Sequence, residues 1–160
     1  MAESMLVVVL LATSIGIIAG LRTMMALAAV SWAASFGWLD LGGTALAFVG
    51  FTWTPWILSA MAAVELMTDQ LSSTPSRTVP VQFGARLGSG ALAGAAIGAA
   101  ADMLTIGAVA GIVGAIIGTL GGRAARARLA SAFRKDPPAA LTEDAVAIIG
   151  AFLVVWVARA

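Results

Sequence analysis

The 160-residue sequence contains neither cysteine nor histidine. Their absence excludes disulfides, metal sites built on thiolate or imidazole ligands, and catalytic designs that need a cysteine nucleophile or a histidine base. Charged residues are also scarce, at 11% of the chain, and the formal net charge is only +1. We therefore expect no nucleic-acid partner, because no global electrostatic field would attract one.

Hydrophobic residues, by contrast, make up 61% of the chain, and the mean hydropathy of +1.01 lies far outside the range of soluble proteins. The apolar runs between charged positions are about 15–20 residues long, which matches a hydrocarbon core roughly 30 Å thick. The sequence therefore predicts an all-α, polytopic bundle of about five transmembrane helices in contact with lipid. Residues 1–160 are expected to form a single transmembrane domain.

The first apolar run extends from Met5 to Leu21 without a charge, and it is long enough to form a span. An acidic residue stands where a cleaved signal would carry Lys or Arg, so we expect this run to be retained. Gly20 beside Arg22 favours a break in the helix. If 23–38 then crosses the membrane, there are six spans and the amino terminus lies outside. If it does not, there are five and the amino terminus is cytoplasmic.

Pro55 leaves two alternatives for the next apolar stretch, 44–67. Either Thr54 caps a helix that has Pro55 at its first position, or the helix begins near Ala45 and is kinked at the proline. The choice determines the depth of Glu65. This residue lies near the middle of the membrane in the first case and at the far interface in the second.

The polar stretch 70–82 contains two prolines and predicts a loop. Two glycine-rich spans, 87–101 and 105–120, follow and are joined by a hairpin that contains Asp102. Their small residues recur at every fourth position, which places them on one helix face where backbones can approach closely. The glycines in these patterns are Gly90, Gly94, Gly98, Gly114, Gly118 and Gly122.

The main group of basic residues lies at 123–135 and is expected to form a short cytoplasmic loop. The last span is expected over 145–157, with Thr142 as its N-cap and acidic residues beside it at the positive helix end.

Two stretches of the sequence are similar to each other: SIGIIAGLR at 14–22 and VGAIIGTLGGR at 113–123. Each is an apolar segment that ends in Gly and Arg and precedes an Ala-rich piece. With five spans the two copies would enter the membrane from opposite sides. This predicts an inverted repeat of halves 5–68 and 104–159 around a central span, 87–101, a pattern common in transporters.

Several short motifs, spread over most of the chain, also resemble one bacterial membrane family. They are Gly20-Leu21-Arg22, Glu65-x3-Asp69, the loop with Pro75 and Pro80, Arg86, the run GSGALAGAAIGA, and Glu143-Asp144. The chain is similar in these motifs to the family catalogued as domain of unknown function 4126. It departs from the family's Asp-Lys-x-Pro, which stands here as Asp69-Gln70-Leu71-Ser72. The resemblance implies a compact multispan protein of the bacterial inner membrane and brings no established activity.

Ionisable residues inside spans are the strongest functional pointers, because each costs about 2.5–3.5 kcal/mol to insert. Arg22, Glu65 and Asp69 are candidates to bind a solute or ion, and Arg77 and Arg86 are candidates from the adjoining loop. Glu65 and Asp69 share a helix face and would repel each other unless a cation, an arginine or a proton intervenes. The structural alternative is an ion pair at helix ends.

The leading functional prediction is a transporter or channel-like protein for a small solute or ion, acting as a homo-oligomer with glycine zippers between helices. The alternative is a non-transporting scaffold or accessory subunit that binds a partner protein or lipid. A lipid-modifying enzyme with Glu65 and Asp69 as acid and base is a third alternative, although no nucleophile accompanies them. No cofactor, metal ligand set or catalytic constellation is expected.

Overall fold

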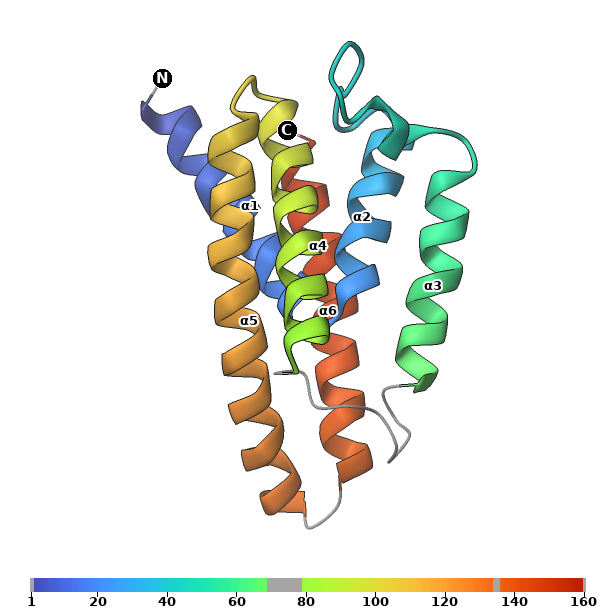
Figure 1. Ribbon diagram of the computed structural model, residues 1–160, viewed down its shortest axis with the longest axis vertical. Helices are drawn as coiled ribbons and strands as arrows, with labels where there is room; N and C mark the ends of the chain where they lie inside the picture. Colours follow the sequence, from blue (N-terminus) through green and yellow to red (C-terminus); the bar gives the residue numbers. More distant parts are fainter. Residues whose placement is uncertain (1, 69–78, 134–135, 160) are drawn as a thin grey trace.

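The computed structural model describes residues 2–68, 79–133 and 136–159, and the regular structure in these residues is entirely helical. This confirms the all-α prediction. The elements, shown in Figure 1, are α1 (Ala2–Leu21), α2 (Thr23–Ser35), the short 3₁₀ helix η1 (Ala47–Gly50), α3 (Thr54–Thr68), α4 (Pro80–Ala99), α5 (Leu104–Phe133) and α6 (Asp136–Ala158).

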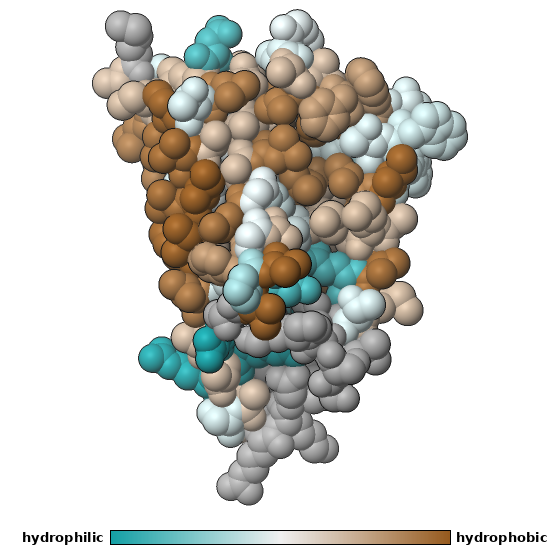
Figure 2. All heavy atoms as spheres, in the orientation of Figure 1, coloured by the Kyte–Doolittle hydropathy of each residue, from teal (hydrophilic) through white to brown (hydrophobic). Residues whose placement is uncertain are grey.

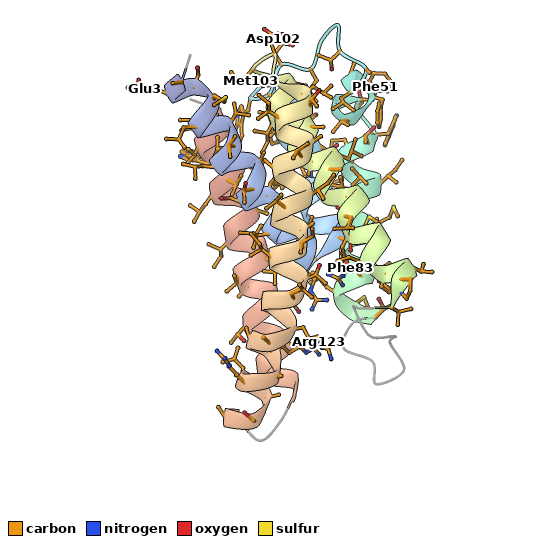
Figure 3. All side chains as sticks on the ribbon, turned by 60° about the vertical axis from the view of Figure 1, so that its left-hand side comes forward. Glu3, Phe51, Phe83, Asp102, Met103 and Arg123 are labelled. Carbon is orange, nitrogen blue, oxygen red and sulfur yellow. The ribbon has the colours of Figure 1, made fainter. Side chains whose placement is uncertain are left out.

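Successive helices alternate in direction, so both chain ends lie at the same end of the bundle, which we call the termini end (Figure 1). Figure 3 shows Glu3, Phe51 and Asp102 at this end, and Arg123 toward the opposite end. We call the opposite end the basic end. The segment 23–35, whose path the sequence left open, runs back toward the termini end as α2.

Within the described residues, three helical segments are long and apolar enough to cross a membrane: Ala2–Leu21, Leu104–Ala132 and Ala140–Ala158. The apolar helix α2 has 13 residues, and its length of about 20 Å is less than the roughly 30 Å of a hydrocarbon core. Large apolar side chains cover much of the outer surface (Figure 2), and hydrophilic ones gather mostly toward the basic end. The chain is thus built for contact with lipid rather than water.

A new helix begins around Pro55, as in the first alternative, but Thr54 is not shown to cap it, because its hydroxyl donates to the carbonyl oxygen of Phe48. The helix α3 begins at Thr54 with Pro55 in its first turn, and η1 forms a separate element before it. Proline suits this position, because its missing N–H would have no helical partner there and its φ is already close to the helical value. Glu65 therefore lies three turns into α3, about 16 Å from the helix start.

Three of the predicted boundaries are wrong. The predicted loop 70–82 extends too far, because α4 begins at Pro80, again with proline in the first turn. The basic stretch is not a loop up to Phe133, because α5 continues through it as a helix. Thr142 is not an N-cap, because α6 already begins at Asp136.

Glycines allow α5 to approach both α4 and α1 with almost no space between the backbones. A Cβ atom added to Gly111 would overlap the carbonyl oxygen of Gly90 on α4, and one added to Gly118 would overlap that of Ile17 on α1. Gly94 in turn lies against the carbonyl oxygen of Gly107. Only residues without a side chain fit at these positions.

The two similar sequence stretches do not have the same local structure. After Leu21 the helix breaks, whereas α5 runs unbroken through Arg123. The helices α1 and α5 also run in the same direction, from the termini end to the basic end (Figure 1). An inverted relation between the two halves therefore finds no support in this arrangement.

Candidate functional site at the break between α1 and α2

The candidate site is built around the one-residue break between α1 and α2. Arg22 has an extended backbone, with φ −140° and ψ 108°, and its own side chain does not cap α2. Such a break leaves the last carbonyls of α1 and the first amides of α2 without helical partners. In the interior of a membrane protein these groups must be satisfied by other parts of the protein.

Glu65, on α3, satisfies the amides. Its Oε1 accepts a hydrogen bond from the N–H of Thr23, and its Oε2 accepts one from the N–H of Met24, both at 2.8 Å. The carboxylate thus caps α2 from a different helix and uses both oxygens. A negative charge is favourable here because the amino end of a helix carries a partial positive charge.

Arg86, on α4, satisfies the carbonyls. Its Nη1 donates to the carbonyl oxygens of Gly20 at 2.7 Å and Leu21 at 2.8 Å. The side chain is only 2% exposed, so these hydrogen bonds form away from water. A positive charge suits the carboxyl end of α1 for the same electrostatic reason that Glu65 suits the start of α2.

Two hydroxyl groups complete the contacts to the backbone. Ser89 Oγ donates to the carbonyl oxygen of Thr23 at 2.7 Å, and Thr119 Oγ1 lies 3.4 Å from the carbonyl oxygen of Gly20. The Thr119 hydroxyl also donates to Ala115 O, one turn earlier in α5, at 2.7 Å. Helices α3, α4 and α5 thus all contribute polar groups to a single interruption of the backbone.

The Arg22 guanidinium is completely buried and lies against Asp144 of α6. Its Nε donates to Asp144 Oδ1 at 2.7 Å, and Nη2 is in ion-pair contact with the same oxygen. Asp144 is itself 7% exposed. Each charge of such a buried pair depends on the other, because an isolated charge in this environment would be strongly unfavourable.

A second, looser pair lies next to this one toward the basic end. Arg126 Nη1 is 3.8 Å from Glu143 Oε2. Both side chains line a small cavity of about 150 Å³ between α5 and α6, which Leu21 also lines. The cavity places charged groups beside the carboxyl end of α1, on the side of the cluster nearest the arginines of α5.

The depth of the cluster follows from Thr119, which lies about 22 Å along α5 from Leu104 at 1.5 Å per residue. A hydrocarbon core that starts at Leu104 would extend for roughly 30 Å. With the core in that position, the cluster would lie inside it rather than at either interface.

Three of the five residues predicted for the site come together at the break: Arg22, Glu65 and Arg86. They meet through the backbone of residues 20–24. Arg22 contacts Asp144, and the Glu65 carboxylate contacts amides of α2. The other two predicted residues, Asp69 and Arg77, lie outside the described residues.

Sequence reasoning missed Asp144, Ser89 and Thr119 as members of the cluster. Asp144 was assigned to the start of a helix, where a carboxylate is common and needs no further explanation. A usable signal was present in the buried arginine itself, because Arg22 within an apolar run demands a carboxylate from a distant part of the chain. No signal distinguishes Ser89 or Thr119 from other hydroxyls.

The chemistry of the cluster is that of charge pairing and hydrogen bonding. No group of three Asp, Glu, His or Cys side chains in the described parts of the chain is arranged to hold a metal ion. The cluster combines the capping carboxylate of Glu65 with a buried Arg–Asp pair and a second arginine, all at the joint between two helices.

The fold and the cluster together define the class: an α-helical integral membrane protein with a broken helix whose ends are capped by side chains from other helices. No protein-family model, curated protein or solved structure matches the chain. The resemblance to domain of unknown function 4126 therefore stays a prediction.

Proposed function

We propose that this protein is a transporter or channel-like protein for a small solute or ion, and that the solute or ion acts on the cluster around the α1–α2 break. Helices interrupted within the membrane are a recurring way to build binding sites in transporters, because the interruption presents charged helix ends to a ligand. Ionisable residues at this depth are costly and are a functional hypothesis by default.

The observation that carries the proposal is the Glu65 carboxylate, which holds the start of α2 through the amides of Thr23 and Met24. A proton or cation that binds this carboxylate competes directly with the two amides. Binding would weaken the link between α3 and α2 and let the joint at Arg22 open. Ligand binding and helix movement are thus coupled through a single side chain.

A flux assay with the purified protein in liposomes tests this function. The wild type is expected to carry at least one ion or small metabolite from a broad panel. Glu65→Gln is expected to reduce that flux roughly ten- to hundredfold, because losing a hydrogen bond to a charged group is worth about 1.5–3 kcal/mol.

Glu3→Gln is the matched control, because Glu3 is an exposed carboxylate at the other end of α1 and should leave the flux unchanged. Absence of flux for the whole panel, with folded protein verified in the same liposomes, would contradict the proposal. So would full flux in Glu65→Gln.

The topology proposed is that of a multi-pass protein of the bacterial inner membrane with its basic end in the cytoplasm. Arg123, Arg126 and Arg128 lie on the part of α5 at this end, and short segments rich in arginine stay on the cytoplasmic side. Both chain ends would then lie outside. Labelling of single cysteines introduced at Ala2 and Ala127 with an impermeant reagent, on intact cells, tests this orientation.

The proposal includes a homo-oligomer, with glycine zippers that pack between copies as well as within one chain. Gly84, Gly88 and Gly121 support this part, because a Cβ added to any of them would have no other atom within 4 Å. Small residues thus remain at the outer surface of α4 and α5, where a second chain can approach closely. Cross-linking in native membranes tests it.

The rival function, a scaffold or accessory subunit, is favoured by one observation. The helix α5 has 30 residues and extends beyond the candidate site, with Arg123 and Arg128 exposed on it. Such a helix offers a basic surface to an acidic partner or to anionic lipid. A stoichiometric partner that co-purifies with the wild type and is lost in Arg123→Gln/Arg128→Gln, together with absence of flux, would favour the scaffold.

A further inference from the structure

A groove of about 400 Å³ lies on the outer surface of the bundle, on the opposite side of α2 from α4. The helix α2 forms its floor, and α3 and α6 form its two walls. The floor and both walls contain alanines, and their small side chains leave the hollow: Ala28, Ala29, Ala33, Ala62, Ala63 and Ala151.

The groove is apolar over nearly all of its lining. The Trp32 indole N–H is satisfied within it, because Trp32 Nε1 donates to Ser59 Oγ at 2.9 Å. Large apolar side chains around it, such as Val64 and Phe152, are more than half exposed. The groove therefore opens on an apolar outer surface. In a membrane protein such a surface faces the acyl chains of lipid.

The length of the groove corresponds to one leaflet. Along α2 it extends from Met25 to Phe36, which is about 16 Å at the helical rise. Half of a hydrocarbon core roughly 30 Å thick is about 15 Å. At its inner limit, Met25 and Leu66 adjoin the residues that form the Glu65 cap, and its outer limit lies at the termini end.

Aromatic rings surround the outer limit. Trp32 stacks with Phe36 at 5.2 Å between ring centroids, and Trp38 meets Trp156 edge-to-face at 5.8 Å. Tryptophan is enriched where the apolar core of a bilayer meets its headgroups. The ring cluster therefore places the mouth of the groove at headgroup level.

A positive charge is fixed at this mouth. The Arg159 guanidinium carbon lies 3.2 Å from the centroid of the Trp156 ring and 5.5 Å from that of Trp38, which lines the groove. Stacking on two rings orients the guanidinium, and its N–H groups match the geometry of phosphate oxygens. The site thus has a positive charge at its mouth and an apolar groove below it, which matches the anionic headgroup and the acyl chain of a phospholipid.

From this combination we infer that the groove between α3 and α6 is a specific site for one phospholipid, with an acyl chain along α2 and an anionic headgroup at Arg159. The site is independent of the proposed transport function. Its inner limit lies beside the Glu65 cap, so a bound chain would pack against the residues next to the joint between α1 and α2.

Native mass spectrometry of the full chain, released from vesicles of equal parts phosphatidylglycerol and phosphatidylcholine, tests the site. The wild type is expected to retain one phosphatidylglycerol after detergent washing. Ala63→Trp places a large ring in the groove at an exposed position of α3, and should reduce this retention roughly tenfold or more. Ala60→Trp is the matched control, because Ala60 is also exposed on α3 but does not line the groove.

Arg159→Gln tests the contribution of the headgroup separately from that of the acyl chain. It should abolish the preference for phosphatidylglycerol over phosphatidylcholine while a lipid is still retained. If Ala63→Trp does not fold, Ala29→Leu fills the groove from α2 and serves as the second variant.

Three results would overturn the inference: no lipid retained by the wild type, equal retention in Ala63→Trp and Ala60→Trp, or a dimer mass that only the groove-filling variant removes. The last result would assign the groove to a second copy of the chain.

Discussion

Small residues line two regions of this bundle, with opposite results. Between α5 and its neighbours α1 and α4, glycines of α5 lie against the backbone of the other helix, and the backbones meet without space for a methyl group. Along α2, α3 and α6, the small side chains of alanines leave a groove of about 400 Å³. The first region is closed, and the second is open.

The difference shows that a small side chain does not by itself bring helices together in lipid. Backbones approach where small residues on both helices lie at the same level, because dispersion contacts then form along the whole interface. Where small residues of α2 face large ones of α3 and α6, such as Leu66 and Phe152, the walls are held apart. The α1–α2 break joins the two regions, and its charged cluster fixes one to the other.

The largest effect is expected from placing a large side chain at Gly111, in the closed region. In Gly111→Leu the side chain would overlap backbone atoms of Gly90, and α4 and α5 would have to separate. We expect a loss of more than about 4 kcal/mol, and hence no folded protein, measured as loss of the monodisperse peak in detergent. Gly88→Leu, at an open position of α4, should elute as the wild type does. Equal behaviour of the two variants would contradict the interface.

The next largest loss of stability is expected from breaking the Arg22–Asp144 pair, which lies at the joint between the two regions. Arg22→Met leaves Asp144 buried without this cation and is expected to cost about 3–5 kcal/mol. The double variant Arg22→Met/Asp144→Leu should regain most of this loss, because it removes both charges. Thermal unfolding in micelles measures both. A double variant less stable than the single one would show that the pair does not act as a unit.

A smaller loss is expected at the end of α1. Arg86→Leu removes the donor to the carbonyl oxygens of Gly20 and Leu21 and should destabilise the protein by about 1–3 kcal/mol. Arg128→Leu is the control, because Arg128 is exposed near the far end of α5. Thermal unfolding in micelles measures both variants. An equal effect of the two substitutions would show that Arg86 does not stabilise the protein by capping α1.

The smallest expected effect is a gain in stability rather than a loss. Gly88→Ala adds a methyl group where no atom lies within 4 Å, so only helix propensity changes, and stability should rise by about 0.8–1 kcal/mol. Gly94→Ala, at a position of α4 that lies against the backbone of α5, should lower the stability instead. Two shifts of the same sign in the unfolding midpoint would mean that the close approach is absent.

Much of the architecture could be predicted from the sequence, because lipid imposes simple requirements. The uncharged run to Leu21 had to be a helix, and Gly20 beside Arg22 marked the break that the structure contains. At Pro55 the residues alone left two alternatives. The choice depended on tertiary contacts, since η1 and the loop around it pack against α2.

The wrong boundaries have two physical causes. Arginines in the stretch 123–135 indicate the side of the membrane but not whether the chain is helical there. Alanine, leucine and arginine all favour helix, so α5 continues to Phe133. Pro137 and Pro138 do not prevent α6 from beginning at Asp136, because proline is well accommodated in the first turn of a helix.

The candidate site was predicted in part. Three residues could be selected because ionisable groups in apolar runs are costly, but their pairing could not be derived. Arg22 and Asp144 are 122 positions apart in the chain, and their contact depends on how α1 and α6 pack. The groove along α2 has no signature in the sequence, because alanines in a helix predict neither an open nor a closed surface.

The central claim is that Glu65 of α3 holds the start of α2 at the break. Hydrogen–deuterium exchange of the Thr23 and Met24 amides, measured on the protein in lipid nanodiscs, tests it most directly. We expect both amides to be protected in the wild type and to exchange roughly ten- to hundredfold faster in Glu65→Gln, in keeping with about 1.5–3 kcal/mol for a charged hydrogen bond. Fast exchange in the wild type, or equal protection in the variant, would contradict the account.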